Sequence, residues 1–178
     1  MVKLSRRLNE SVNLASRDGT DLVYFERIQV KQIISIDLPI GARLPLYNTA
    51  LGRCLITFLP LQESEVLINS MDSVLTAANA HGQLYKQIEF GHSHGYSLSD
   101  EEFTQGLRAA AVPVWNSDNR IAAALSVAVP TFRVSIERLK QTMVPQLYET
   151  AKKISLSLGA TQDWIEGGWR KTILVRKS

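Results

Sequence analysis

The pattern of apolar and polar positions is clearest between Gly95 and Val129. Two runs rich in alanine and valine, Leu107–Trp115 and Ile121–Val129, flank a polar segment at residues 116–120. Apolar runs of this length predict strands that are buried on both faces, and Asn, Asp and Ser between them favour a turn. We therefore expect a β-hairpin here, with the rest of the chain covering or framing it.

Upstream of this hairpin, the pattern predicts one helix and three strands. Leucines four residues apart indicate a short helix at residues 4–10. Alternating or β-branched positions predict strands at residues 11–17, 22–30 and 33–36. The Asp-Gly pair at residues 18–19 favours a tight turn, so the first two strands should form a hairpin of their own.

Helical spacing predicts three helices between the two hairpins. The first, at residues 50–59, is apolar on nearly all sides and should therefore be buried. Thr49 is the preferred cap, because its hydroxyl can accept a hydrogen bond from a free N–H group of the first turn. Two amphipathic helices are expected at residues 62–69 and 80–91, with a loop at residues 71–79 between them.

The C-terminal part predicts one long helix at residues 134–158, in which apolar residues recur every three or four positions. Pro145 lies inside this pattern and should kink or divide the helix. The order helix, strands, helices, strands, helix indicates an α+β fold with a mainly antiparallel sheet flanked by helices. Residues 161–178 change in character and are expected to form a tail outside the core.

Length and composition indicate the broad class of protein. A chain of 178 residues with 45% hydrophobic and 21% charged residues suits one globular domain, or at most two small ones. The single cysteine, Cys54, excludes an internal disulfide framework and fits a reducing compartment. No apolar run reaches the roughly 20 residues that a membrane helix needs. We therefore expect a cytoplasmic protein without a membrane partner.

The net charge of +3 does not by itself indicate a nucleic-acid-binding chain. Four basic residues and no acidic residue lie at positions 170–178, and without them the chain carries 16 basic and 17 acidic residues. The body of the chain is therefore near neutral and has no basic stripe of the kind that a phosphate-binding face needs. We expect no DNA contact from this chain alone.

Residues that could carry chemistry lack the spacing of a catalytic or metal site. His92 and His94, with His81 upstream, favour an exposed polar segment, because a metal site needs three or four converging donors. Cys54 has no base at a recognisable spacing, which favours a buried structural thiol. The acids at residues 100–102 favour a solvated segment or a helix N-terminus over an acid–base pair. We expect no catalytic residue, no metal and no cofactor.

Arg108 stands at the start of a buried strand of small residues, where an unpaired charge would be very costly. Two interpretations remain open: pairing with the acids that precede it, or a bidentate contact to a ligand carboxylate. The alanines of the hairpin leave volume, which is either filled by larger side chains or left as a pocket. Ser126 would offer a hydroxyl into that space.

Three groups of motifs follow one another along the chain: G-A-R-L-P-L-Y-N-T-A-L-G-R at residues 41–53, Gly95-Tyr96 with the acids of residues 100–102, and Gly106-Leu107-Arg108 with Ala111-Val112-Pro113-Val114. In this order and spacing they resemble the ligand-binding domain of IclR-family bacterial transcriptional regulators. The resemblance covers nearly the whole chain, from about Leu4 to Gly159. The motifs are most similar to the branch that senses aromatic acids such as protocatechuate or 4-hydroxybenzoate.

The resemblance implies a GAF-like domain that binds a small organic acid in a pocket over its sheet and assembles into dimers and tetramers. It divides the chain into the end of a linker helix at residues 1–10, the effector-binding domain at residues 11–160 and a C-terminal tail at residues 161–178. DNA would be bound only through an N-terminal winged helix-turn-helix domain, which is absent from this chain.

The resemblance also implies where the effector pocket lies. Its expected frame is the third strand, the start of the buried helix, a loop and the hairpin, namely Ile33, Ile36, Asn48, Thr49, Ala50, Leu51, Ser99, Ala109, Ser126 and Ala128. We add Arg108 as a direct contact to the effector carboxylate. A helix N-terminus also suits a carboxylate, because its free N–H groups and dipole favour anions. The alanines offer few hydrogen-bonding side chains, which favours a larger, flatter acid over a glyoxylate-like one.

The function expected from the sequence is a ligand-sensing regulatory domain that binds a small aromatic carboxylate and modulates DNA binding of an attached helix-turn-helix domain. Two alternatives remain. An oligomerisation module without a ligand would have a filled core over the sheet. A small hydrolase or isomerase working through Asp100, Glu101 or His94 would need titratable groups that converge on one cavity.

Overall fold

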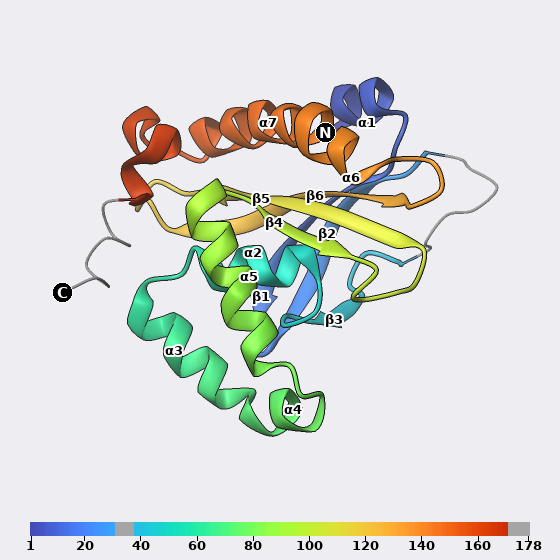
Figure 1. Ribbon diagram of the computed structural model, residues 1–178. Helices are drawn as coiled ribbons and strands as arrows, with labels where there is room; N and C mark the ends of the chain where they lie inside the picture. Colours follow the sequence, from blue (N-terminus) through green and yellow to red (C-terminus); the bar gives the residue numbers. More distant parts are fainter. Residues whose placement is uncertain (31–37, 171–178) are drawn as a thin grey trace.

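One antiparallel sheet lies between two layers of helices in the computed structural model, which describes residues 1–30 and 38–170 (Figure 1). Its strand order is β3-β2-β1-β6-β5-β4, and each neighbouring pair is antiparallel. The α+β architecture predicted from the order of elements is confirmed. The strands are β1 (Val12–Asp18), β2 (Asp21–Ile28), β3 (Arg43–Pro45), β4 (Ser97–Asp100), β5 (Leu107–Trp115) and β6 (Ile121–Pro130).

The predicted central hairpin is the middle of this sheet. β5 and β6 pair from Leu107 opposite Pro130 to Trp115 opposite Ile121, and β6 also pairs with β1. β1 and β2 form the other predicted hairpin, with Gly19 at a φ of 62° in its turn. The strand predicted at residues 33–36 lies outside the described residues.

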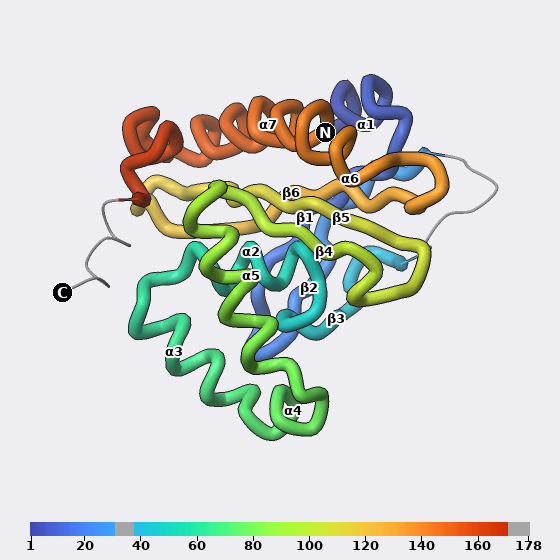
Figure 2. Tube along the Cα trace, in the orientation of Figure 1, coloured from blue at the N-terminus to red at the C-terminus, as the bar shows by residue number. Residues whose placement is uncertain are grey.

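Four helices lie on one side of the sheet, with α2 and α5 against it and α3 and α4 farther out, as Figures 1 and 2 show: α2 (Ala50–Thr57), α3 (Leu61–Ser70), α4 (Asp72–Ala77) and α5 (His81–His94). The loop predicted at residues 71–79 is wrong, since α4 occupies most of it. This short helix places Leu75 in the core, where the side chain is fully buried. A segment of six residues is too short for its apolar spacing to be told from that of a loop.

The start of α2 is fixed by a cap and by a close backbone contact. The Thr49 hydroxyl accepts a hydrogen bond from the Gly52 N–H group at 3.0 Å, which confirms the predicted cap. Gly52 packs against the backbone of Leu46: a Cβ atom added at Gly52 would lie 2.1 Å from the Leu46 carbonyl oxygen. Only glycine therefore fits here, and the segment before α2 is held tightly against the helix.

The opposite face is covered by α1 (Val2–Leu8), by α6 (Ile136–Arg138) and η1 (Leu139–Met143), and by α7 (Val144–Ser157). η1 is a stretch of π-helix that ends just before Pro145, in the first turn of α7. Proline lacks the N–H group that a continuous helix would use, and the wider π turn takes up that break. The irregularity expected near Pro145 takes the form of this π turn, and Gly159 follows the end of α7 with a φ of 84°.

Residues 161–170 are not a tail outside the core, contrary to the prediction. Trp164 opens the short segment η2 (Trp164–Gly168), and Trp169 is buried. The rings of Phe58 and Trp169 meet edge to face at 5.1 Å, and those of Trp115 and Trp164 do so at 5.8 Å. Large aromatic rings bury enough apolar surface to hold an irregular segment against the core. Residues 171–178 lie outside the described part. Across the described residues, no helix is long and apolar enough to cross a membrane.

Candidate functional site

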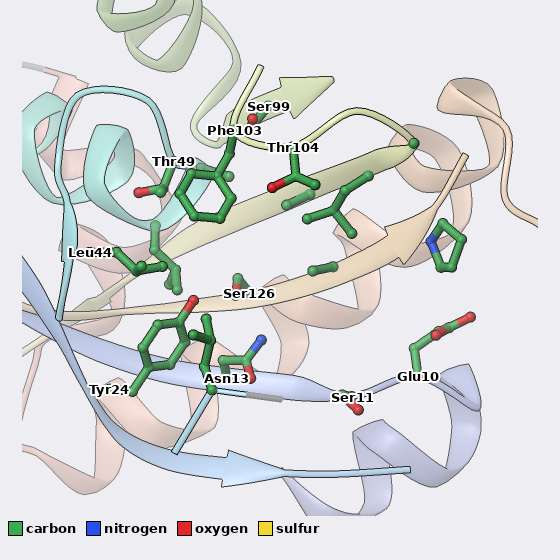
Figure 3. A pocket seen from close by; sticks show the side chains of 18 of the residues that line it. Glu10, Ser11, Asn13, Tyr24, Leu44, Thr49, Ser99, Phe103, Thr104 and Ser126 are labelled. Carbon is green, nitrogen blue, oxygen red and sulfur yellow. The ribbon is translucent and has the colours of Figure 1, made fainter. Parts of the chain in front are cut away.

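A cavity of about 350 Å³ lies between the sheet and the N-terminal end of α2 (Figure 3). β1, β5 and β6 form its floor, while the start of α2 and the loop at residues 103–107 close it from the other side. Ligand pockets commonly have volumes of about 300–1,000 Å³. The cavity is therefore the right size for a small organic molecule.

Small side chains on the central strands create this space. Ala109 and Ala128 lie opposite each other on β5 and β6, and both line the cavity. Ser126 and Asn13 lie opposite each other on β6 and β1, and they add two polar side chains to the floor. A larger side chain at either alanine would fill the space, so the volume follows directly from the alanine-rich hairpin.

The first turn of α2 faces this floor. Thr49, Ala50 and Leu51 line the cavity. Ala50 and Leu51 are the first helical residues, so their N–H groups have no partner within the helix, and the helix dipole makes this end positive. Backbone donors and a positive dipole end together favour an anion.

Apolar side chains supply much of the remaining wall, including those of Leu38, Leu44 and Phe103. Tyr24 adds a ring with a hydroxyl group. Burial raises the pKa of Tyr24, although the nearby charge of Arg27 lowers it. The Tyr24 hydroxyl is therefore protonated at neutral pH and can both donate and accept a hydrogen bond.

An ion pair at the edge of the cavity connects the floor to α1. Arg133 Nε donates to Glu10 Oε1 at 2.9 Å, and Arg133 Nη2 donates to Glu10 Oε2 at 2.8 Å. Both residues line the cavity, and Glu10 is only 4% exposed. The Ser5 hydroxyl of α1 donates to the Glu10 carbonyl at 2.8 Å. The end of α1 and the segment after β6 are thus tied together at the cavity edge.

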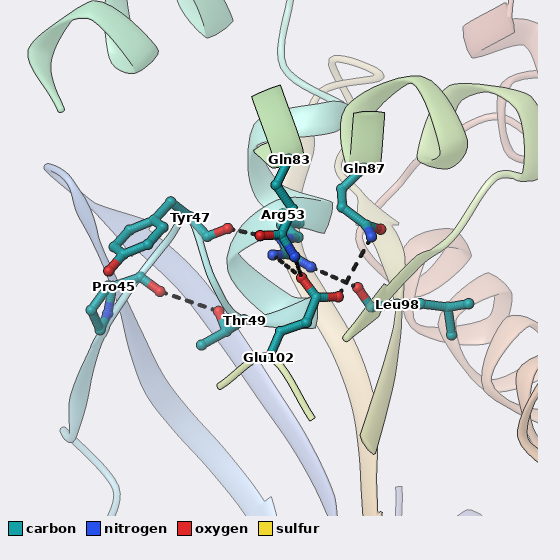
Figure 4. A network of polar contacts seen from close by, with 8 residues as sticks. All are labelled: Pro45, Tyr47, Thr49, Arg53, Gln83, Gln87, Leu98 and Glu102. Carbon is teal, nitrogen blue, oxygen red and sulfur yellow. Dashed lines mark hydrogen bonds and ion pairs between the residues drawn. The ribbon is translucent and has the colours of Figure 1, made fainter. Parts of the chain in front are cut away.

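A second, more deeply buried arginine organises the start of α2 (Figure 4). The Arg53 side chain is 3% exposed. Its Nε donates to the Tyr47 carbonyl at 2.8 Å, its Nη1 to the Leu98 carbonyl at 3.2 Å and its Nη2 to Glu102 Oε2 at 2.6 Å. A guanidinium fork with several acceptors can be buried because its charge is both paired and hydrogen-bonded.

Glu102 is the anchor of the loop that closes the cavity. Besides Arg53, it accepts hydrogen bonds from Gln83 and, at 3.5 Å, from Gln87 Nε2, both on α5. The loop residues 103–107 follow it immediately and line the cavity. The prediction of a solvated acidic segment is therefore wrong for Glu102, because its carboxylate neutralises a buried arginine.

Sequence comparison identifies the domain. Residues 1–156 match the family described as bacterial transcriptional regulator IclR C-terminal. The chain belongs to this family. It is 31% identical to the Pca regulon regulatory protein of Pseudomonas putida over 156 residues, which cover 85% of the chain and 54% of that protein. It is 35% identical to the HTH-type transcriptional regulator XynR of Escherichia coli K12 over 162 residues, which cover 89% of the chain and 64% of that protein.

The fold comparison agrees with this assignment. The IclR C-terminal domain described above is similar to the PobR transcription factor inducer binding domain from Acinetobacter, crystallised as a double mutant with 3-hydroxybenzoic acid. The TM-score is 0.74 and the sequence identity 26%, over 86% of this chain and 91% of that one. Since the chain spans less than two thirds of either curated relative above, it corresponds to their regulatory part rather than to their whole length.

Most of the predicted pocket residues come together in this IclR-type domain. The residues that line the cavity are Thr49, Ala50, Leu51, Ser99, Ala109, Ser126 and Ala128. Asn48 precedes the helix cap and is not among the lining residues. Ile33 and Ile36 lie outside the described residues.

Arg108 does not line the cavity, so the structure gives no support to its predicted contact with an effector. Its Nε donates to Asp100 Oδ1 at 2.9 Å, and its Nη1 donates to the Val134 carbonyl at 3.0 Å. The physical reason is strand alternation: Ala109 lines the cavity, so its neighbour Arg108 points to the opposite face of the sheet. The interpretation of Arg108 as an ion pair with a preceding acid matches this geometry.

Sequence reasoning missed Asn13, Tyr24 and Phe103, which also line the cavity. Asn13 lies in a strand that alternates polar and apolar residues, a pattern that usually marks one solvated face. Here helices cover both faces of β1, so its polar face meets the cavity, and Asn13 is only 6% exposed. Phe103 follows a run of acidic residues, and no pattern in the sequence around it indicates a residue that lines a cavity.

The candidate catalytic residues do not converge on the cavity. Asp100 pairs with Arg108, Glu101 accepts from the Gly106 N–H group, and His94 hydrogen-bonds through Nδ1 to the Phe90 carbonyl. The IclR C-terminal family is a regulatory domain, so the chain is not an enzyme, and the hydrolase or isomerase alternative is not favoured.

Cys54 and the metal candidates fit structural roles. Burial raises the pKa of the Cys54 thiol well above its usual range, so the thiol stays protonated and unreactive. His92 Nε2 lies 2.7 Å from the Thr57 carbonyl oxygen. Within the described residues, no three His, Cys, Asp or Glu side chains are grouped to hold a metal ion.

Proposed function

We propose that this domain is an effector sensor, which binds a small aromatic carboxylate in the cavity between the sheet and α2 and passes its occupancy to an attached DNA-binding domain. The observation that carries the proposal is the cavity itself. It combines an alanine floor, apolar walls and a helix N-terminus at one side. Pockets with this mixture of apolar surface and a few convergent polar groups are typical ligand sites.

The start of α2 is the proposed site of the effector carboxylate. The N–H groups of Ala50 and Leu51 have no partner within the helix, and the dipole of α2 adds a favourable field. The Thr49 hydroxyl is already used to cap Gly52, so it fixes the geometry of this turn. A carboxylate here would replace water on backbone donors that the fold leaves available.

An aromatic ring fits the remainder of the cavity. The alanines of the floor are flat and apolar, and Leu44 and Phe103 provide apolar walls. The names of two similar proteins also support an aromatic ligand. One is a Pca regulon regulatory protein, and the other is an inducer binding domain crystallised with 3-hydroxybenzoic acid. We extend that ligand class to this chain as part of the proposal.

The contacts around Glu10 offer a route by which occupancy reaches the DNA-binding domain. Glu10 and Ser11 line the cavity and come directly after α1, whose Ser5 is bonded to the Glu10 carbonyl. A ligand that shifts this edge of the cavity would therefore shift the end of α1. We propose that α1 leads to a helix-turn-helix domain and that the protein acts in the cytoplasm as a dimer or tetramer.

The alternative of an oligomerisation module with a filled core is not supported, because the space over the sheet is open. No observation in the described residues favours a second function.

A thermal-shift panel tests the proposal. We expect millimolar hydroxybenzoates to raise the melting temperature, because a ligand that binds the native state stabilises it. Ala128→Leu should abolish this rise by filling the cavity. Ala122→Leu, the same change on β6 at a residue that does not line the cavity, should preserve it. Arg108→Ala should preserve it too, since Arg108 pairs with Asp100 outside the cavity.

The proposal fails if no aromatic carboxylate, dicarboxylate or keto acid in the panel raises the melting temperature. It also fails if Ala128→Leu leaves the rise unchanged, because the ligand would then bind elsewhere.

A further inference from the structure

A second cavity, of about 200 Å³, lies beside the turn between β5 and β6. It shares no lining residue with the proposed effector cavity over the sheet. All three tryptophans of the chain line it: Trp115, at the end of β5, and Trp164 and Trp169. Thr161 Oγ1 donates to Asn119 Oδ1 at 3.3 Å, which ties the segment that carries the last two tryptophans to the turn. A molecule held here would be separate from the effector.

The aromatic rings of this second cavity stand nearly at right angles to one another. The ring centre of Phe58, at the end of α2, lies 5.7 Å from that of Trp115 and 5.1 Å from that of Trp169, with interplanar angles of 79° and 85°. Trp115 and Trp164 meet at 5.8 Å and 88°. Perpendicular rings do not form a flat stack, so they enclose a corner of aromatic surface. Trp164 is only partly buried, so solvent reaches its ring.

The charged side chains of the second cavity leave it with an unpaired acid. Asp118 and Arg120 both line it. Arg120 Nη2 donates to Glu63 Oε1 at 2.5 Å, so the positive charge of Arg120 is neutralised. Asp118 is exposed, and in the described part of the chain its carboxylate has no ion-pair partner. The charge that faces the cavity is therefore negative.

Aromatic faces and a carboxylate together favour a cation. The face of an indole ring is electron-rich and attracts cations, most strongly where water is excluded. The chain itself gives an example, since the Arg170 guanidinium lies 4.9 Å from the centre of the Trp169 ring. Arg170 does not line the cavity, so it does not fill the space. A quaternary ammonium group suits the cavity better than a primary one, because its methyl groups also gain from apolar contact with the rings.

We propose that this cavity is a second ligand site, which binds a small quaternary ammonium ion between the tryptophan rings and Asp118. Two of the three tryptophans, Trp164 and Trp169, lie beyond residues 1–156, the part of the chain that matches the IclR C-terminal family. The family match therefore does not account for this site. The inference also does not depend on the proposed effector function, because the two cavities have no lining residue in common.

Fluorescence titration of the chain with choline chloride tests the proposal, with sodium chloride used to keep the ionic strength constant. Because all three tryptophans line the cavity, their emission reports directly on binding there. Choline should give a saturable change and bind about 5- to 30-fold more tightly than dimethylbutanol, its neutral carbon isostere. Equal affinities for the two compounds, or no saturable change with choline, would overturn the proposal.

Two substitutions assign the binding to this cavity. Trp164→Leu should weaken choline binding by about 5- to 30-fold, because it removes one aromatic wall. Asp118→Asn should weaken it by about 2- to 5-fold, because the attraction of an exposed carboxylate is screened, and should leave the affinity for dimethylbutanol unchanged. If Trp164→Leu does not fold, the wild-type comparison and Asp118→Asn decide the question.

Asp163→Asn is the matched control for the charge. Asp163 is also exposed and directly precedes Trp164, but it does not line the cavity. Choline affinity in this variant should stay within about twofold of the wild-type value. Equal losses in the two aspartate variants would mean that choline responds to overall charge, and they would contradict a specific site.

Ala128→Leu separates this site from the effector cavity. Ala128 lines the effector cavity and not the second one, so filling that space should leave choline binding unchanged. Loss of choline binding in this variant would show that choline binds over the sheet, and it would overturn the second site. Failure of every organic acid to bind would overturn the effector proposal and leave the ammonium site standing.

Discussion

At the scale of single residues, two arginines differ in whether the sequence indicates how deeply they are buried. Arg108 stood out because it starts an apolar strand, yet its partner Asp100 is half exposed, with 44% of its side chain accessible. Arg53 sits in an apolar helix and is the buried one. Its acceptors include Leu98 and Glu102, 45 and 49 residues away, and no local pattern reveals partners that distant.

Arg53→Met should therefore lower the free energy of unfolding by about 3–5 kcal/mol, because it removes the charge that pairs with Glu102 and the donor to two carbonyl groups. Arg108→Met should cost much less, about 1 kcal/mol, because its partner Asp100 is solvated. Urea unfolding of the two variants measures the difference. Equal costs would mean that the Arg53 network does not hold the start of α2.

At the scale of elements, the sequence predicts those that are long or that carry a specific terminal signal. The central hairpin and the buried helix with its Thr49 cap are confirmed, and a π turn precedes Pro145 in the long helix. The short elements β3, β4 and α4 were not predicted. With three to six residues each, they are held by pairing and packing rather than by their own pattern.

The contact between α2 and the segment before it gives a prediction at this scale. Gly52→Ala should lower the free energy of unfolding by about 3 kcal/mol or more, because the new Cβ would meet the backbone of Leu46. Gly82→Ala is the matched change on α5, where nothing lies within 4 Å of the added atom. It should raise stability by up to about 1 kcal/mol through helix propensity.

Thermal and urea unfolding of both glycine variants provide the measurement. A tolerated Gly52→Ala would show that the start of α2 can move away from Leu46, and the proposed carboxylate site would then lack a rigid frame.

At the scale of the whole molecule, the site is assembled from segments far apart in the chain. The cavity uses β1, β5, β6, the start of α2 and a loop, and its edge is closed by an ion pair between Glu10 and Arg133, 123 residues apart. Resemblance to a family supplied part of the lining, namely Thr49, Ala50, Leu51, Ser99, Ala109, Ser126 and Ala128, because related chains share the fold. Asn13 and the Glu10–Arg133 pair could not be foreseen, since their roles depend on helices that cover both faces of the sheet.

The central claim is that this cavity binds an aromatic carboxylate with its acid group at the start of α2. A crystal structure of the chain with the most stabilising hydroxybenzoate tests it most directly. The account predicts ligand density in the cavity, with the carboxylate within hydrogen-bond distance of the Ala50 and Leu51 N–H groups. An empty cavity, or a ligand bound elsewhere on a folded domain, would contradict it.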